Sequence, residues 1–426
     1  MISAWVSARL AARGIHYGWI MVAVTFFTAL VSSASVGAPG VFILPLEKEF
    51  GWSTTQISSA LSIRLLLFGL MAPFAAALMV RFGLRNVVMS ALTVITIGLL
   101  ASLAMTQAWH LIALWGFVVG FGTGMTAMVL GATVATRWFV AHRGLVVGIF
   151  AASVATGQLI FLPIMAHLTE AFGWRIALGM MCAMLAFAAL MVLLFMSDRP
   201  SDLGLRPVGD DGTAPAAPAP AANSIVSAAF AALRDASKTR VFWILFGTFF
   251  VCGASTNGLV QTHLIPMCAD FGIPSTTSAN LLAAMGIFDF VGTIASGWLS
   301  DRYSNRWLLF WYYGLRGLSL IFLPFTDFSF YGLSLFAVFY GLDWIATVPP
   351  TVKLTAKHFG PERAAMVFGW VFVGHQLGSA TAAFGAGLTR TLYETYLPAF
   401  FAAGVLCLIA AAVMMLIRTT PKTVTA

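Results

Sequence analysis

Charged residues are scarce in this sequence: they make up 9% of its 426 residues, against about 25% in an ordinary soluble domain. Hydrophobic residues make up 60%. A chain of this length with so few charges cannot cover the surface of a water-soluble fold. The composition therefore excludes a soluble globular protein and favours a chain that lies in a membrane.

Cysteine is scarce too, and no Cys-x-x-Cys spacing occurs. The four cysteines all lie in or at the ends of apolar stretches: Cys182, Cys252, Cys268 and Cys407. This pattern predicts packing cysteines rather than a disulfide framework or a metal site. A P-loop nucleotide motif, a cofactor motif and a catalytic triad are also missing. We therefore expect no cofactor, no bound metal and no enzymatic activity.

Long apolar runs, by contrast, are plentiful. A bilayer core needs about 20 apolar residues per helical span. Twelve runs come close to or exceed that length: 17–44, 55–79, 87–107, 109–136, 144–168, 175–196, 241–268, 277–300, 307–325, 330–353, 364–391 and 397–417. They predict an all-α membrane protein with twelve transmembrane helices.

A polar break divides the runs into two sets of six. We expect an N-terminal six-helix bundle in residues 1–197, a linker in 198–240 and a C-terminal bundle in 241–426. Such symmetry is typical of transporters in which two bundles rock around a central site. The Pro/Ala-rich part of the linker is expected to stay extended. Residues 224–240 fit either a short helix on the membrane surface or a solvated linker.

The basic residues indicate the orientation. If the N-terminus is cytoplasmic, 17 of the 23 Lys and Arg residues lie on the cytoplasmic side. This positive-inside bias predicts cytoplasmic termini. The net charge of +8 then reports topology and contact with lipid rather than with nucleic acid. The first apolar run is too long for a signal-peptide core, so we expect a retained span of a multi-pass protein, in a bacterial plasma membrane.

Two loops repeat at corresponding places in the halves. The second span leads into Arg81-Phe-Gly-Leu-Arg85, and the eighth into Gly297-Trp-Leu-Ser-Asp301-Arg302. Both resemble the G-x-L-x-D-R-x-G-R loop of the major facilitator superfamily, which implies two pseudo-symmetric six-helix bundles and a gating or structural role for these residues. The N-terminal copy has Val80 in place of the aspartate, so Arg81 and Arg85 alternatively serve only as topology charges.

Further phrases are similar to the monocarboxylate transporter and oxalate/formate antiporter branches of that superfamily. They are His16-Tyr-Gly-Trp19, Phe50-Gly-Trp52, Arg137-Trp-Phe139, Phe172-Gly-Trp-Arg175 and Arg199-Pro-Ser-Asp-Leu-Gly-Leu205. The likeness covers most of the chain at the level of the fold and rests mainly on the N-terminal half at the level of the branch.

Ionisable groups at bilayer depth are costly unless they are paired or hydrated, which makes them the best functional clues. Arg64 lies in an apolar part of the second span. Its fork of donors suits a carboxylate, so we interpret it as the anchor of an anionic substrate. The alternative is a structural pair with a buried acid.

Asp289 in the eighth span is the expected proton-coupling residue. Monocarboxylate transporters carry an Asp at a similar depth, followed one turn later by an Arg, where this chain has Thr293. Asp343 in the tenth span is a second candidate for proton coupling, for substrate binding or for pairing with Arg316. The ninth span is peripheral in the family, which favours a structural role for Arg316, and a permanent pair of Arg316 with Asp289 is the competing interpretation.

The repeat also suggests which faces meet. Alignment of Arg81 with Arg302 places Met285 opposite Arg64, and Asp289 lies one turn after Met285 on the same helical stripe. We therefore expect Arg64 and Asp289 to share one membrane-embedded site.

Uncharged polar residues complete the expected substrate site. They are Asn257 and Gln261 in the seventh span, His375 and Gln376 in the eleventh, and Gln158 in the fifth. A lone histidine more often bonds to a neighbouring helix, so a structural role for His375 stays open.

These observations predict a secondary transporter that moves a small organic anion, a monocarboxylate above all, by alternating access and in symport with protons. Two alternatives remain: an exporter of hydrophobic compounds with the same fold, and a membrane sensor that binds ligand without transport. The substrate itself, the direction of transport and the oligomeric state do not follow from the sequence.

Overall fold

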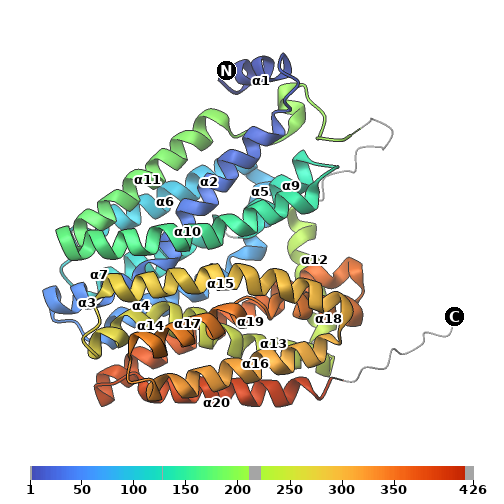
Figure 1. Ribbon diagram of the computed structural model, residues 1–426. Coiled ribbons are helices and arrows are strands. Elements are labelled where there is room, and N and C mark those ends of the chain that lie inside the picture. Colours follow the sequence, from blue (N-terminus) through green and yellow to red (C-terminus); the bar gives the residue numbers. More distant parts are fainter. Residues whose placement is uncertain (1, 127, 211–221, 418–426) are drawn as a thin grey trace, which may run out of the picture.

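The computed structural model describes residues 2–126, 128–210 and 222–417, which form helices joined by short turns (Figure 1). No β-strand occurs within these ranges. Each of the predicted apolar runs coincides with one helix or with several helical segments in line. In the described residues, nine helical segments are long and apolar enough to cross a membrane, judged by length and composition.

The N-terminal half begins with a short helix, α1 (Ile2–Ala11), which the hydropathy pattern did not predict. The segments of the first six spans follow: α2 (Gly18–Gly37) and α3 (Pro39–Phe50); α4 (Thr54–Leu70) and α5 (Ala72–Phe82); α6 (Leu84–Ser102); α7 (Ala108–Leu111), a π-helix (Ile112–Val119), α8 (Gly120–Thr126) and α9 (Met128–Trp138); α10 (Arg143–Phe172); and α11 (Trp174–Phe195).

The C-terminal half repeats this pattern. Its segments are α13 (Arg240–Gly253), a π-helix (Ala254–Val260) and α14 (Gln261–Asp270); α15 (Ser275–Arg302); α16 (Asn305–Phe322) with a 3-10 turn (Leu323–Phe325); α17 (Phe330–Asp343) and α18 (Val348–Phe359); α19 (Pro361–Tyr393); and α20 (Leu397–Met414).

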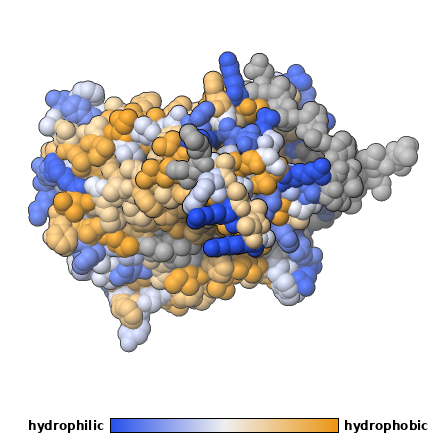
Figure 2. All heavy atoms as spheres, turned by 90° about the horizontal axis from the view of Figure 1, so that it is seen from above, coloured by the Kyte–Doolittle hydropathy of each residue, from blue (hydrophilic) through white to orange (hydrophobic). Residues whose placement is uncertain are grey.

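Large apolar side chains lie on the outside as well as in the core. Ile97, Phe117, Ile176 and Trp311 are each more than half exposed, and Figure 2 shows hydrophobic residues over the middle of the visible face, between hydrophilic residues at its two ends. A surface of this kind suits lipid rather than water. The protein is therefore a multi-pass membrane protein.

Each half has its own apolar core. One cluster of buried residues lies wholly between Tyr17 and Met196, and another lies between Ala232 and Ile417. The halves meet where α4 packs along α19, α10 along α15, and α3 against α14. In Figure 1, α10 and α15 lie side by side between the two bundles.

Several spans are interrupted within the bundle. The first is interrupted at Ala38, just before Pro39, and the tenth forms turns in place of continuous helix over residues 344–347, just before Pro349 and Pro350. A proline inside a helix removes a backbone donor and clashes with the preceding turn, which accounts for these two breaks. The fourth and seventh spans contain π-helical stretches, a rare form that is frequent at functional sites.

The two ends of the molecule differ. We call the end that carries α3, α7 and the turn between α14 and α15 the α3 end (left in Figure 1), and the opposite end the α12 end, after α12 (Ala222–Ala236). Hydrogen bonds join the two bundles in the half of the molecule toward the α3 end. They link Thr55 to Thr391, Ser62 to the Ala380 carbonyl, and Glu170 to Thr276.

Two parts of the linker, residues 198–210 and 222–240, are described and form defined structure. Residues 200–203 form a 3-10 turn, and the Val208 amide donates to the Trp138 carbonyl, at 2.8 Å, so this part docks on the N-terminal bundle. Residues 211–221 lie outside the described ranges. The predicted helix is present as α12, and it packs against both α5 and α19. Trp370 of α19 donates to the Ala229 carbonyl of α12, at 2.8 Å.

Close packing of the seventh and eleventh spans requires glycine at position 378. A Cβ atom there would lie 1.9 Å from the Phe250 carbonyl oxygen, whereas a Cβ at Gly385, on the same helix, would meet nothing within 4 Å. We expect Gly378→Ala to lower the free energy of unfolding by about 1–3 kcal/mol, because α13 must shift. Gly385→Ala is the matched control, and thermal unfolding in detergent is the measurement. Equal midpoints for the two variants would contradict this account of the packing.

Candidate functional site

Four Asp and Arg side chains are buried at membrane depth. Arg64 is 4% exposed, Asp289 5%, Asp343 7% and Arg316 0%. Burial of a charge costs several kcal/mol unless it is paired and hydrogen-bonded. The partners of each side chain therefore indicate what it does.

The break in the tenth span exposes backbone groups that a continuous helix would pair internally. Between Asp343, where α17 ends, and Val348, where α18 begins, turn hydrogen bonds pair the Trp344 amide and the Ile345 carbonyl, but the neighbouring Ile345 amide and the carbonyls of Trp344 and Ala346 have no helical partner. In a membrane such groups must be satisfied by protein, since no water is present in the lipid core. The surrounding side chains do this.

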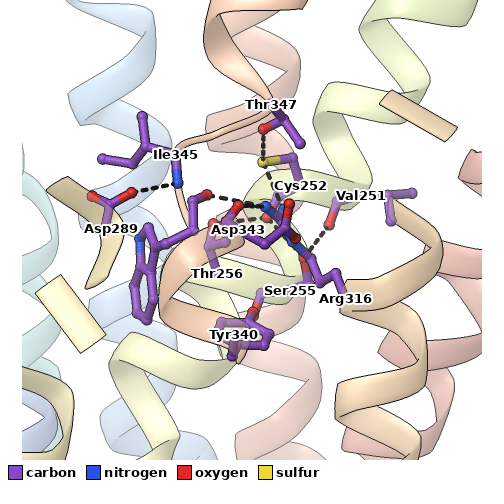
Figure 3. A network of polar contacts seen from close by, with 11 residues as sticks. Val251, Cys252, Ser255, Thr256, Asp289, Arg316, Tyr340, Asp343, Ile345 and Thr347 are labelled. Carbon is purple, nitrogen blue, oxygen red and sulfur yellow. Dashed lines mark hydrogen bonds and ion pairs between the residues drawn. The ribbon is translucent and has the colours of Figure 1, made fainter. Parts of the chain in front are cut away.

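Arg316 of α16 binds the carbonyl side of the break (Figure 3). Its Nη2 donates to the Trp344 carbonyl, at 3.0 Å, and to the Asp343 carbonyl. Its Nε donates to Oδ2 of Asp343, at 2.7 Å, in an ion pair, and its Nη1 donates to the Cys252 sulfur, at 3.0 Å. Arg316 thus joins the seventh, ninth and tenth spans, and its charge is balanced by Asp343.

Asp289 of α15 binds the amide side of the same break. Its Oδ1 accepts hydrogen bonds from the Ile345 amide, at 2.8 Å, and from the Thr293 hydroxyl, at 3.0 Å. Ser296, two turns after Asp289, donates to the Ala346 carbonyl, at 2.5 Å. The eighth span therefore supplies an acceptor and a donor to the interrupted backbone of the tenth.

Arg64 of α4 has a related position at the break in the first span. It donates to the Ser35 carbonyl, at 2.8 Å, and to the Val36 carbonyl, at 3.0 Å, in the last turn of α2. A cation is favourable there because the C-terminal end of a helix carries partial negative charge. Among the described residues, no carboxylate forms an ion pair with Arg64, so its full charge lacks a counter-ion.

A narrow cavity lies between the bundles beside Arg64. Its lining combines the break in the first span with the seventh span: Val36, Gly37, Pro39, Gly40, Arg64, Leu65, Asn257, Gln261 and Thr262. Three residues that the sequence analysis proposed for substrate binding, Arg64, Asn257 and Gln261, thus meet at one place. The cavity can present one cationic and two amide side chains to a small polar molecule.

The expected shared site of Arg64 and Asp289 is not formed. No hydrogen bond or ion pair joins these two described residues, and each serves a different break, in the first and in the tenth span. Asp289 accepts from Thr293 and from the Ile345 amide, while Arg64 donates to carbonyls of α2. The competing interpretation, a direct Asp289–Arg316 pair, is not formed either.

His375 and Gln376 lie on the buried side of α19. The His375 ring stacks on Phe372, with ring centres 5.5 Å apart, and lies against Phe249. The side chain of Gln376 packs closely on Gly69 of the other bundle. His375 Nδ1 and Gln376 Oε1 are buried polar atoms without a hydrogen-bond partner in the described part of the chain. Gln158 belongs to α10, but its side chain lies outside the described residues.

The repeated loops hold the α12 ends of helices. Asp301 forms an ion pair with Lys353 of α18, and Arg302 lies over the Trp298 ring, at 4.0 Å. In the N-terminal copy, the Arg85 amide donates to Asp198, at 2.8 Å, and the Arg81 side chain lies over Phe82, at 5.2 Å. Asp198 thus supplies the carboxylate that Val80 does not.

At the α3 end, a surface ion pair lies within the N-terminal bundle. Arg175 Nη2 lies 2.6 Å from Oε1 of Glu49, and Trp174 donates to the same carboxylate. The hydrogen bond from Arg175 lowers the pKa of Glu49. Because both ionised side chains are partly exposed, the pair contributes little to stability.

Sequence reasoning missed Cys252 and Asp198. Cys252 contacts Arg316 and the Thr347 hydroxyl, the latter at 3.3 Å, and the only signal for it was its place beside the Gly-Ala-Ser-Thr run of the seventh span. Asp198 lies in the phrase Asp-Arg-Pro-Ser-Asp that follows the sixth span. Its distance along the chain from Arg85 hid the pairing.

Comparison with known proteins identifies relatives across the chain. The family model of the Major Facilitator Superfamily matches residues 25–383, with a second match over 260–426. An uncharacterized MFS-type transporter, YcxA of Bacillus subtilis, is 22% identical over 89% of this chain and 90% of its own length. Monocarboxylate transporter 13 of Rattus norvegicus is 26% identical over 94% and 88%.

Solved structures show the same fold. A bacterial homolog of the human lysosomal transporter Spinster, in an inward-facing and unoccupied conformation, superposes with a TM-score of 0.73 at 17% identity, over 94% of this chain and 96% of that one. The xylose transporter XylE from E. coli, in a partially occluded inward-open conformation, has a TM-score of 0.69 at 13% identity, over 94% and 99%.

The buried pair of Arg316 and Asp343 allows a direct test. Arg316→Met leaves the Asp343 carboxylate and two carbonyls unpaired, so we expect a loss of about 3–5 kcal/mol in the free energy of unfolding. The double variant Arg316→Met with Asp343→Leu should recover part of this loss. Arg302→Met at the surface is the control, expected within about 0.5 kcal/mol of the wild type. Thermal unfolding is again the measurement, and a wild-type midpoint for Arg316→Met would show that the pair is dispensable.

Proposed function

We propose that this chain, which belongs to the major facilitator superfamily and is a membrane transporter, moves a small organic anion, a monocarboxylate above all, by alternating access coupled to protons. The observation that carries the proposal is Arg64, a buried cation that has no counter-ion among the described residues and lies beside a cavity between the two bundles. The resemblance to monocarboxylate transporters over most of the chain supports the substrate class.

The charge on Arg64 favours an anionic ligand. Two of its donors are used by carbonyls of α2, which fix the guanidinium in place but do not neutralise it. Its Nε is buried without a hydrogen-bond partner among the described residues. A carboxylate that entered the cavity would supply the missing charge and accept from this donor. Arg316 is not available for this role because Asp343 already balances it.

Neighbouring polar groups would position the rest of the ligand. Asn257 and Gln261 lie on one face of the seventh span and line the cavity with Arg64. Gln376 approaches the second span from the other bundle. The cavity has a volume of about 10 Å³, room for roughly one water molecule, so a ligand would enter only after the bundles move apart; the argument against the exporter alternative is the polar and cationic lining.

Proton coupling is assigned to Asp289 rather than to Asp343. Asp343 is held in an ion pair by Arg316, whereas Asp289 has two donors and, in the part of the chain that the structure describes, forms no ion pair. Protonation of Asp289 would weaken its hydrogen bond from the Ile345 amide. Since that amide lies in the break of the tenth span, a proton on Asp289 would loosen the link between the eighth and tenth spans.

The contacts between the bundles fit the state of an alternating-access cycle that is closed toward the outside. The positive-inside bias favours an orientation with the α12 end in the cytoplasm. The hydrogen bonds between bundles toward the α3 end would then close the outer side. In this orientation the cavity would be reached from the cytoplasm after movement of α12, and both termini would be cytoplasmic.

Uptake into proteoliposomes tests the substrate class. A panel of labelled small carboxylic acids is offered under an inward-directed proton gradient. Accumulation of one acid that collapses with the gradient is the expected result. If no acid enters vesicles that contain folded protein, while hydrophobic amines or neutral compounds are moved, the exporter alternative is favoured. Ligand binding without flux would favour the sensor.

Arg64→Gln tests the anion anchor. We expect the apparent affinity for the transported acid to fall by about tenfold or more, because a charge-assisted hydrogen bond is lost. Arg64→Lys should retain part of the affinity. Arg175→Gln, which removes an arginine from the surface pair with Glu49, is the matched control and should transport normally. Unchanged affinity in Arg64→Gln would remove Arg64 from the site.

Asp289→Asn tests the proton-coupling role. The amide oxygen can still accept from the Ile345 amide and from Thr293, so the break should keep its structure. We expect exchange of labelled for unlabelled acid to persist, while accumulation driven by a proton gradient is lost. Asp202→Asn, in the linker, is the control. Gradient-driven accumulation by Asp289→Asn at the wild-type level would place the coupling group elsewhere.

A further inference from the structure

Two of the contacts that join the bundles at the α3 end share one chemical form. Glu170, in the last turn of α10, accepts a hydrogen bond from the Thr276 amide, at 2.8 Å, and another from the Thr276 hydroxyl. Thr391, near the end of α19, accepts from the Thr55 amide, at 3.1 Å, and from the Thr55 hydroxyl, at 2.8 Å. In each case one bundle provides the acceptor and the other provides the first turn of a helix.

The two contacts are related by the internal repeat. Thr276 follows Thr55, and Thr391 follows Glu170, by the same offset of 221 residues that separates Arg302 from Arg81. Thr55 is the second residue of α4 and Thr276 the second residue of α15. The contacts are therefore equivalent positions in the two halves, with the roles of the bundles exchanged.

We propose that Glu170 and Thr391 form a pair of crossed caps, each of which caps a helix of the opposite bundle and holds the α3 end of the transporter closed. The amides in the first turn of a helix have no partner within the helix. A side-chain oxygen that accepts from them stabilises the helix start. When that oxygen belongs to the other bundle, the stabilisation exists only while the bundles are together.

The cap on α15 depends on the other bundle more than the cap on α4. Ser53 precedes α4 and forms a complete capping box with Gln56, so that helix already has a cap of its own. The residue before α15 is Pro274, which makes no side-chain cap. Glu170 therefore supplies the side-chain cap that Pro274 cannot provide. Its negative charge also attracts the positive N-terminal end of α15.

These hydrogen bonds are weak enough to break and form again during transport. Glu170 and Thr391 are exposed, so water replaces the lost hydrogen bonds when the bundles separate at this end. A hydrogen bond that is exchanged for water contributes only modestly to the closed state, which leaves the opening reversible. Thr391 keeps its own hydroxyl proton on the Gly387 carbonyl, at 3.0 Å, so its lone pairs face Thr55.

The inference rests on the proposed alternating access, but it is tested without any substrate. Spin labels are attached to cysteines that replace Lys48 in α3 and Tyr331 in α17, which are exposed and lie in different bundles at the α3 end. Distance distributions are measured in nanodiscs. The parent chain without added cysteines controls for labelling of the four native thiols, which are buried.

We expect Glu170→Ala to raise the ratio of open to closed distances about fivefold or more, because α15 then loses the side-chain cap that the described structure gives it. Thr391→Val should raise it about twofold to threefold, since α4 keeps its capping box. Glu170→Gln, which keeps an acceptor but loses the charge, should fall between the wild type and Glu170→Ala. If Glu170→Ala does not fold, the comparison is made between Glu170→Gln and the wild type.

Matched controls lie beside each cap. Glu49→Ala removes a carboxylate at the same end that pairs within its own bundle, and Thr389→Val removes a hydroxyl that bonds within its own helix. Both should leave the distances unchanged. Distributions of the Glu170 and Thr391 variants that match their controls would overturn the proposal, even if acid uptake occurs as expected. A shift as expected in a protein that moves no acid would support the caps and count against the proposed substrate class alone.

Discussion

The structure depends on one constraint: backbone groups released by a break in a membrane helix must find partners inside the protein. The tenth span shows how this is done. Arg316 binds the carbonyls of Asp343 and Trp344, Asp289 binds the Ile345 amide, and Ser296 binds the Ala346 carbonyl. Asp289 and Arg316, which the sequence marks as buried charges, therefore stabilise the backbone of an interrupted helix.

The two buried arginines differ in how their charge is balanced. This difference is why we assign a structural role to Arg316 and propose a substrate-binding role for Arg64. Both donate to carbonyls at the end of a broken helix. Arg316 also has a carboxylate partner in Asp343, whereas Arg64 has none among the described residues and lines a cavity with Asn257 and Gln261. A buried charge without a partner is costly. The cost is understandable if a transported anion provides the partner for part of the cycle.

The internal repeat is lost among the buried charges but is retained in the contacts between the bundles. In the interior, the equivalent of Arg64 is Met285, and the charged network of the second half has no copy in the first. At the α3 end the repeat is kept, because Thr55 and Thr276 start equivalent helices and are capped from equivalent positions. The acceptors nevertheless diverge into Thr391 and Glu170, which makes the two halves of this contact unequal in strength.

The sequence by itself determined the number and order of the apolar runs, the division into two halves and the positions of the buried charges. These follow from local rules, namely helix length in a bilayer, the avoidance of charge in lipid and the repeat of the Arg81 and Arg302 loops. Tertiary structure alone decided the partners. Asp343 rather than Asp289 pairs with Arg316, Asp198 replaces the missing aspartate near Arg85, and Arg64 and Asp289 do not meet. The physical reason is that a partner is chosen by the few hydrogen-bonding groups within about 3 Å, and in this protein those groups are backbone atoms freed by helix breaks, which side-chain spacing along the sequence does not reveal.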